Sequence, residues 1–356
     1  MTNTAVLQVE RAGPLVTIQD GGRPRMMRYG IPASGPMDTF AHAAANTVLG
    51  RPPRSTAIEV SLGGLSLVCR AGPVTVSVCG GGFTITHAKQ RCSSWTVCTL
   101  HDGEGLTIAA GGWGSWCYLA VAGDLVAASW LGSTSTHVRS ELGGGPVRTG
   151  TNLNIDNTWA DDARDGPVDV PEVARPTRTL RAVLGPQLHC FHADAADRLT
   201  SSRYTFTTAY DRMGVRLDGP PLELREALAI PSTPIVRGSV QVAGDGVPTL
   251  LFADHQTTGG YPKIATVVTD DARRATQLRA GDSVQFTPID PADAVHVARL
   301  AAQQRQHHLV DLADRPGLRT RRLLQTNLID GVFHPNLTSD EETTQVLAPP
   351  GSPVDR

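Results

Sequence analysis

Lysine is almost absent from this sequence of 356 residues. Among 32 lysines and arginines, only Lys89 and Lys263 are lysines. Arginine would serve equally well at a merely solvated position, whereas a guanidinium cannot replace an ammonium group that must titrate. The scarcity therefore draws attention to the surroundings of the two lysines.

A strong net charge and a long apolar run are also missing. The formal net charge of -2 provides no field of one sign that would attract nucleic acid or an anionic membrane. No stretch approaches the roughly 20 apolar residues of a membrane helix, and the first residues lack a basic region followed by an apolar run. We therefore expect a cytoplasmic protein that binds neither nucleic acid nor membranes.

Cysteine and histidine do not form any metal-binding pattern. The six cysteines are scattered without a C-x-x-C pair, and the 11 histidines include no H-E-x-x-H motif. These spacings predict buried free thiols rather than disulfides or a metal site, so no metal is expected.

The residues that are abundant indicate a mainly β protein. The sequence has 36 glycines and 25 prolines but only 5% aromatic residues, which suits many short strands joined by turns. Runs such as AIEVSL, VTVSVCG and WCYLAVAG in the first half, and YTFTTA, SVQVAG and IATVVT in the second, are typical of strands. Two blocks of similar texture predict two β-barrels or sandwiches.

The changes in texture give the expected domain boundaries. We assign 1–150 to an N-terminal β domain, 151–178 to a linker or irregular excursion, and 179–290 to a second β domain. A helical extension over 291–335 and a disordered tail over 336–356 follow. Within the first domain, Asp38 is expected to cap a helix over 39–49.

The loop ADHQTTGGYPKIAT, over 253–266, carries the densest chemical signal. Gly259 and Gly260 expose backbone N–H groups to a ligand. Lys263 and Tyr261 add donors that could polarise an amide carbonyl, while Asp254 manages a nitrogen proton. The candidate catalytic residues are Lys263, Tyr261 and Asp254, and the candidate binding residues are Gln256, Thr257, Thr258, Gly259 and Gly260. The alternative is a β-turn whose lysine faces water.

Two further segments provide candidate binding residues. In TIQDGGRPRMMRYGIPASGPMD these are Gln19, Asp20, Arg23, Ser34 and Asp38, beside a helix start that would favour an anion. In YDRMG they are Asp211 and Arg212. The alternatives are a hairpin with an ordinary helix cap for the first segment, and a structural ion pair for the second.

Several of these motifs together resemble a known family. TIQDGGRP, YGIPASGPMD, AIEVSLGGLSL, DRMGVRL and DHQTTGGYPKIATVV are similar, in order and spacing, to the allophanate hydrolase subunit 2 domain of the biotin-dependent carboxyltransferase-like family. The resemblance runs from about Val6 to Phe286. It implies two cyclophilin-like β-barrel domains with a cleft between them, a few short helices, and a C-terminal helical extension outside the resemblance.

The resemblance also implies a function that depends on other chains. The pattern is most similar to the C subunit of ATP-dependent 5-oxoprolinases, which open the lactam of 5-oxoproline to glutamate together with A-like and B-like partner subunits. ATP would then act at the level of the complex. The alternatives are a carboxyltransferase component acting on urea or a related amide, and a regulator that binds a B-like partner without chemistry.

The implied arrangement places the candidate residues across the cleft. Lys263 would stabilise negative charge on the lactam oxygen, while Gln19, Asp20 and Asp38 position the substrate. No Met-Lys-Met biotin attachment sequence is present, so biotin would have to arrive on another chain. Tyr210 departs from the family, which has a serine at this position.

Overall fold

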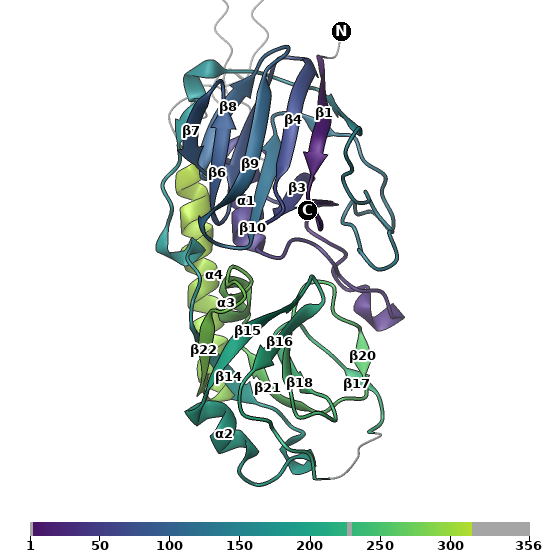
Figure 1. The fold of residues 1–356 in the computed structure, drawn as a ribbon, viewed down its shortest axis with the longest axis vertical. Helices are drawn as coiled ribbons and strands as arrows, with labels where there is room; N and C mark the ends of the chain where they lie inside the picture. Colours follow the sequence, from purple (N-terminus) through teal and green to yellow (C-terminus); the bar gives the residue numbers. More distant parts are fainter. Residues whose placement is uncertain (1–2, 226–229, 315–356) are drawn as a thin grey trace, which may run out of the picture.

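The computed structural model describes residues 3–225 and 230–314 and has two β domains, one above the other in Figure 1. The strands of the first domain form two sheets. The seven-stranded sheet contains, in order, β11 (Asp124–Leu125), β12 (Asn152–Asp156), β1 (Thr4–Ala12), β4 (Leu65–Ala71), β9 (Gly105–Trp113), β6 (Gly82–His87) and β7 (Gln90–Ser93). The six-stranded sheet contains β13 (Gly166–Pro167), β8 (Thr96–Leu100), β5 (Val74–Cys79), β10 (Trp116–Val121), β3 (Ala57–Ser61) and β2 (Thr17–Gln19).

The core of the first domain lies between these sheets. In β1 the alternating residues Ala5, Leu7 and Val9 are buried, which is the pattern of a strand with one face on a core. The six-stranded sheet also has a covered outer face, where helix α1 (Thr39–Val48) packs with Phe40 and Ala44. This double cover explains why every residue of β5 and β10 is buried.

The second domain is a closed barrel of seven strands. In order around the barrel these are β14 (Thr179–Leu184), β21 (Lys263–Val267), β18 (Ser239–Val242), β19 (Pro248–Leu251), β16 (Gly214–Asp218), β15 (Arg203–Tyr210) and β22 (Ser283–Pro288). The parallel pairing of β14 with β22 closes the ring. The ribbon of β17 (Thr233–Pro234) and β20 (Thr258–Gly259) lies outside it.

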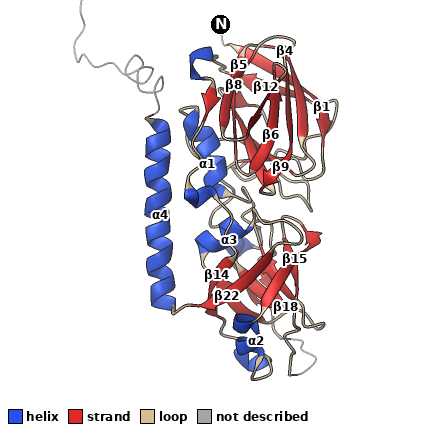
Figure 2. Ribbon diagram, turned by 60° about the vertical axis from the view of Figure 1, so that its left-hand side comes forward, coloured by secondary structure: helices blue, strands red, loops and turns tan. Residues whose placement is uncertain are grey.

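Short helices and one long helix complete the structure. The short ones are α2 (Ala195–Ser201), α3 (Thr269–Ala275) and the 3-10 turns η1 (Met27–Tyr29), η2 (Asp162–Arg164), η3 (Glu172–Ala174) and η4 (Leu188–Cys190). The long helix α4 (Pro291–Ala313) runs beside both domains in Figure 2. The mainly β fold with a few helices and a C-terminal helix is as expected from the sequence.

The predicted linker over 151–178 is instead partly built into the first domain. Strand β12 pairs with β1, and β13 pairs with β8. Leu153 and Ile155 alternate with exposed residues and enter the core between the sheets. The pairing of the first domain therefore continues to Pro167, past the boundary expected at residue 150.

The described residues also bear on the expectations for cysteines, membrane helices and metal sites. Five of the six cysteines are buried, and Cys92 is exposed on β7. No helix within 3–225 and 230–314 is both long and apolar enough to cross a membrane, and no cluster suited to a metal ion occurs there. The end of the predicted helical extension and the predicted tail lie outside the described residues.

Candidate functional site

Arg212 is the centre of a buried ion network between the two domains. Its Nε and Nη2 donate to the two carboxylate oxygens of Asp254 at 2.9 and 3.0 Å, and its Nη1 donates to Glu59 of β3. Nη2 also donates to the carbonyl of Gly35 at 2.6 Å. Burial alone would lower the pKa of Arg212, but Asp254 and Glu59 raise it above its usual value. Arg212 therefore forms an ion pair that joins the domains. A structural ion pair was the alternative to substrate binding for this segment.

Asp38 lies at a second buried contact between the domains. Its Oδ1 accepts from the amides of Phe40 and Ala41, which confirms the predicted helix cap, and from Arg273 of α3 at 2.9 Å. Its Oδ2 accepts from Gln277 at 2.9 Å. Because Asp38 has no exposed surface and both of its oxygens accept hydrogen bonds, it holds the interface between the domains.

The remaining candidates of the first segment stabilise a loop of the first domain. Asp20 accepts from the hydroxyls of Ser133 and Ser135, both at 2.6 Å, and from the amide of Thr134 at 2.9 Å. Arg23 is 2% exposed and donates to carbonyls of the same loop, those of Trp130, Ser133 and Ser135. Gln19, fully buried, donates to Thr17 and Thr136, and Ser34 has a buried hydroxyl. These contacts hold the loop over 130–136 in place, so Gln19, Asp20 and Arg23 each have a structural role.

We predict that Asp20→Asn destabilises the protein at neutral pH and not in acid. Burial would raise the pKa of Asp20, but hydrogen bonds from Ser133, Ser135, Thr134 and Gly22 lower it below the usual value. A lowered folded pKa gives stability that is complete above the unfolded pKa of about 3.9 and is lost as the pH falls through the folded pKa. Losing these charge-assisted bonds should cost about 1–3 kcal/mol at pH 7.

Urea unfolding of wild type and Asp20→Asn at several pH values measures this effect. The two free energies of unfolding should converge as the pH falls below about 3.9. A difference that does not change with pH would show that the carboxylate charge is unimportant.

Lys263 is buried in the second domain. It is 9% exposed, and its Nζ donates to the Thr233 hydroxyl at 2.5 Å and to the Pro234 carbonyl at 3.0 Å, both in β17. An ammonium has three protons, so one remains for another acceptor. Burial lowers the pKa of Lys263. Lys263 therefore does not face water, as it would in a simple β-turn with a solvated lysine.

Lys263 stands at the end of a row of polar residues on the outer face of the barrel. It pairs with Gln241 of β18, which pairs with Thr249 of β19, which pairs with Arg216 of β16. Residues paired across antiparallel strands share a face, whereas the neighbouring Val240 points into the core. The register thus lines up four polar side chains on strands that are distant in sequence.

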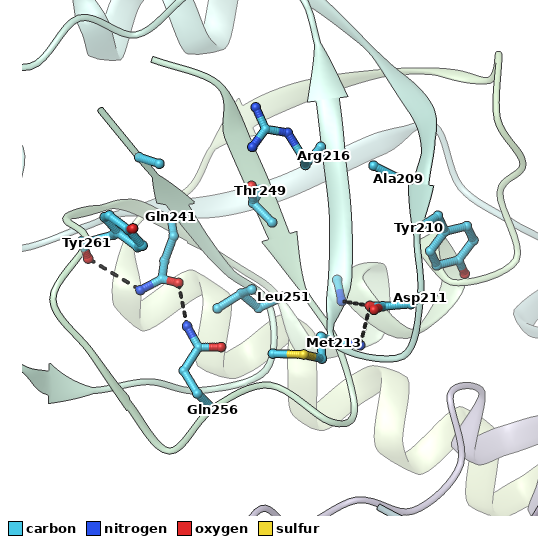
Figure 3. A pocket seen from close by; sticks show the side chains of 12 residues that line it. Ala209, Tyr210, Asp211, Met213, Arg216, Gln241, Thr249, Leu251, Gln256 and Tyr261 are labelled. Atoms are coloured by element: carbon cyan, nitrogen blue, oxygen red, sulfur yellow. Dashed lines mark hydrogen bonds between the residues drawn. The ribbon is translucent and has the colours of Figure 1, made fainter. Parts of the chain in front are cut away.

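A groove of about 540 Å³ crosses this row (Figure 3). Gln256 and Tyr261, from the predicted loop, form one wall, and Tyr210 and Asp211 form the other. The Gln256 amide donates to Gln241 at 2.9 Å, and Gln241 donates to the Tyr261 carbonyl at 3.3 Å. We call this the barrel groove. Lys263 and the glycines Gly259 and Gly260 are not among the residues that line it.

A second cavity of about 360 Å³ lies between the domains. Leu15, Val138 and Arg139 of the first domain line it together with Asp211, Arg212, Met213 and Asp254 of the second. Asp211 and Met213 also line the barrel groove, so the two spaces meet at these residues. We call this second cavity the interdomain lobe.

Comparisons with known proteins agree with this architecture. The family described as "Carboxyltransferase domain, subdomain A and B" matches residues 29–288. The chain belongs to this carboxyltransferase domain family. It is 32% identical to the C subunit of 5-oxoprolinase from Haemophilus influenzae, over 80% of this chain and 91% of that protein.

The carboxyltransferase domain also occurs in larger proteins. A putative urea carboxylase of Emericella nidulans is 30% identical over 82% of this chain, which spans 25% of that protein. The crystal structure of the K. lactis urea amidolyase has a TM-score of 0.76 at 23% identity, over 86% of this chain and 20% of that chain. This last likeness supports the fold alone.

Three residues of this carboxyltransferase domain were missed by sequence reasoning. Glu59 carried a signal, because a lone carboxylate in the apolar run AIEVSL must find a buried partner. Gln241 lies in an ordinary strand pattern, and Arg139 in a loop without a motif. The site thus combines the predicted loop residues Asp254, Gln256 and Tyr261 with partners that only the fold brings near.

Proposed function

We propose that this chain is the C subunit of an ATP-dependent 5-oxoprolinase, which opens the lactam of 5-oxoproline to glutamate with A-like and B-like partner subunits in the cytoplasm. The observation that carries the proposal is the match to nearly the full length of such a C subunit, 91% of the Haemophilus influenzae protein. ATP would act at the level of the complex.

The barrel groove would hold the lactam. Ring opening places negative charge on the carbonyl oxygen, and a preorganised donor in a water-poor site stabilises that charge. Lys263 is the candidate for this role because its ammonium is buried and retains a proton beyond its bonds to Thr233 and Pro234. It lines neither cavity, so the lactam would approach it past Gln241, the groove residue with which it pairs. Gln256, Tyr261 and Thr258 remain candidate substrate contacts at the rim, with Thr257, Gly259 and Gly260 beside them.

Co-expression with the A-like and B-like partners from the same genome tests the proposal. The purified assembly should convert 5-oxoproline to glutamate only when ATP and all three chains are present. Glutamate formation at the same rate without this chain would contradict it.

A second candidate function is carboxyl transfer to urea or a related amide, which the similarity to a urea carboxylase favours. Lys89 and Lys263 lack methionine neighbours, so biotin would be carried by another chain. In the same assay, consumption of urea that needs a biotinylated partner would favour this function. Stable binding to the B-like partner without any turnover would instead favour a regulator.

A further inference from the structure

Two glutamine side chains in the barrel groove form a chain of hydrogen bonds that ends on a backbone carbonyl. Gln241 Nε2 donates to the carbonyl of Tyr261 at 3.3 Å, and Gln256 Nε2 donates to Gln241 Oε1 at 2.9 Å. Gln241 is 4% exposed, and both glutamines line the groove. We call the two amides and this carbonyl the glutamine relay.

The Tyr261 carbonyl sets the direction of the glutamine relay. A carbonyl only accepts hydrogen bonds, whereas a glutamine amide has an accepting oxygen and a donating nitrogen. Gln241 must therefore turn its nitrogen to Tyr261, which leaves its oxygen for Gln256. Gln256 must in turn give its nitrogen to Gln241. The orientation of both amides thus follows from a single main-chain group.

The free end of the relay is a hydrogen-bond acceptor. Gln256 Oε1 points toward Met213 in Figure 3, and it accepts no hydrogen bond from any residue that the structure describes. Met213 and Leu251, which line the same groove, have apolar side chains. An acceptor in such surroundings gains most from a ligand that brings its own N–H or O–H donor.

The relay lies close to the residue that holds Lys263. A Cβ on Gly259 would be 3.0 Å from Gln241 Nε2 and 3.4 Å from Gln256 Nε2. Gly259 pairs with Thr233, whose hydroxyl accepts from Lys263, and paired residues of antiparallel strands have Cα atoms about 4.5–5.5 Å apart. An amide beside Gly259 is therefore near a donor for its oxygen and an acceptor for its N–H.

We infer that Gln241 is a positioning residue that fixes Gln256 as an acceptor, so that the barrel groove distinguishes the N–H of an amide from the oxygen of an ester of the same shape. The inference rests on the proposed function and deepens it. A lactone has an oxygen where a lactam has its N–H, and this oxygen would face Gln256 Oε1 as a second acceptor. A site built around a substrate N–H rejects the analogue that lacks it, because the polar group of the site is left unpaired.

The test compares two neutral five-membered rings in the assembly of all three chains. As competitive inhibitors of 5-oxoproline turnover, 2-pyrrolidinone, a lactam, should bind wild type about tenfold or more better than γ-butyrolactone, the corresponding lactone. In Gln241→Met the amide of Gln256 is free to turn and donate, so this preference should fall about fivefold or more. A preference that is absent from wild type, or unchanged in Gln241→Met, would overturn the inference.

Two further variants separate the orientation of the relay from a general disturbance of the groove. Gln256→Met removes the acceptor itself and should lower the lactam preference as much as Gln241→Met does. The matched control is Thr249→Val, which removes a hydroxyl from the residue paired with Gln241 and leaves the relay in place, so the wild-type preference should persist. A merely structural role of Gln241 would weaken both rings equally and leave their ratio as it was. Loss of the preference in Thr249→Val would place the N–H contact elsewhere and contradict the inference.

Failure of the proposed function would be seen separately, as a wild-type assembly that does not consume 5-oxoproline. The two rings need no turnover, so ligand-observed NMR with the full chain alone then measures the same ratio. A lactam preference that is lost in Gln241→Met supports the inference. Equal binding of the two rings by wild type, or no binding of either, overturns it.

Discussion

Replacing Lys263 by methionine should reduce 5-oxoproline turnover by the assembled enzyme roughly a hundredfold or more, the usual effect of removing a preorganised donor from a developing oxyanion. Methionine keeps much of the apolar stem, and the lost group is the ammonium that β17 holds through Thr233 and Pro234. Steady-state kinetics should show the loss in kcat, because the contact strengthens only as charge develops.

The chain provides its own control for this substitution. Lys89, the other lysine of the sequence, is exposed in the turn before β7, so Lys89→Met should leave turnover unchanged. Circular dichroism and co-purification with the partners verify that the Lys263→Met chain folds and assembles. Native turnover by a Lys263→Met assembly would refute the catalytic role of this lysine.

The second large effect is expected from Arg212→Met. This change leaves the carboxylates of Glu59 and Asp254, 0% and 2% exposed, without their cation. Removing one member of a buried ion pair costs about 3–5 kcal/mol because the remaining charge stays uncompensated. Urea unfolding monitored by tryptophan fluorescence should show this decrease in the free energy of unfolding.

Arg216→Met is the matched control, on the strand that follows. Arg216 pairs with Asp245 at 2.6 Å, but both side chains are more than 40% exposed. Exposed pairs contribute about 0–1 kcal/mol, so this variant should unfold close to wild type. Equal stability of the two variants would show that the Glu59–Arg212–Asp254 network contributes no more than a surface pair.

The sequence predicted local structure where residues close in the chain determine it. The helix after Asp38 and its side-chain cap are confirmed, because the capping residue and the amides that it accepts lie within three positions. The placement of 151–178 was wrong in part. Strand β12 has only two alternating apolar residues, Leu153 and Ile155, a pattern too short to identify a strand without its partner β1, almost 150 residues earlier in the chain.

The candidate site was predictable in two segments, YDRMG with Asp211 and Arg212 and the loop over 253–266. Asp254, Gln256 and Tyr261 line the cavities because one loop carries all three, and Asp211 and Arg212 line them from the segment before β16. The charged residues Asp20, Arg23 and Asp38 make structural contacts. The sequence did not predict these contacts, because residue type alone does not reveal which element lies opposite. Asp38 meets Arg273, 235 residues later, and Glu59 meets Arg212, 153 residues later.

Because helix α4 returns to the first domain, the second domain is inserted between two parts of the first. Its 23 residues span about 35 Å at 1.5 Å per residue, and Leu309 and Leu312 near its end pack beside α1 of the first domain. The polypeptide thus leaves and re-enters the first domain, so the barrel is tethered on two sides. Fluorophores at Thr4 and Asp314 would keep a constant separation if the domains hinged, whereas a pair at Thr4 and α2 would report the motion.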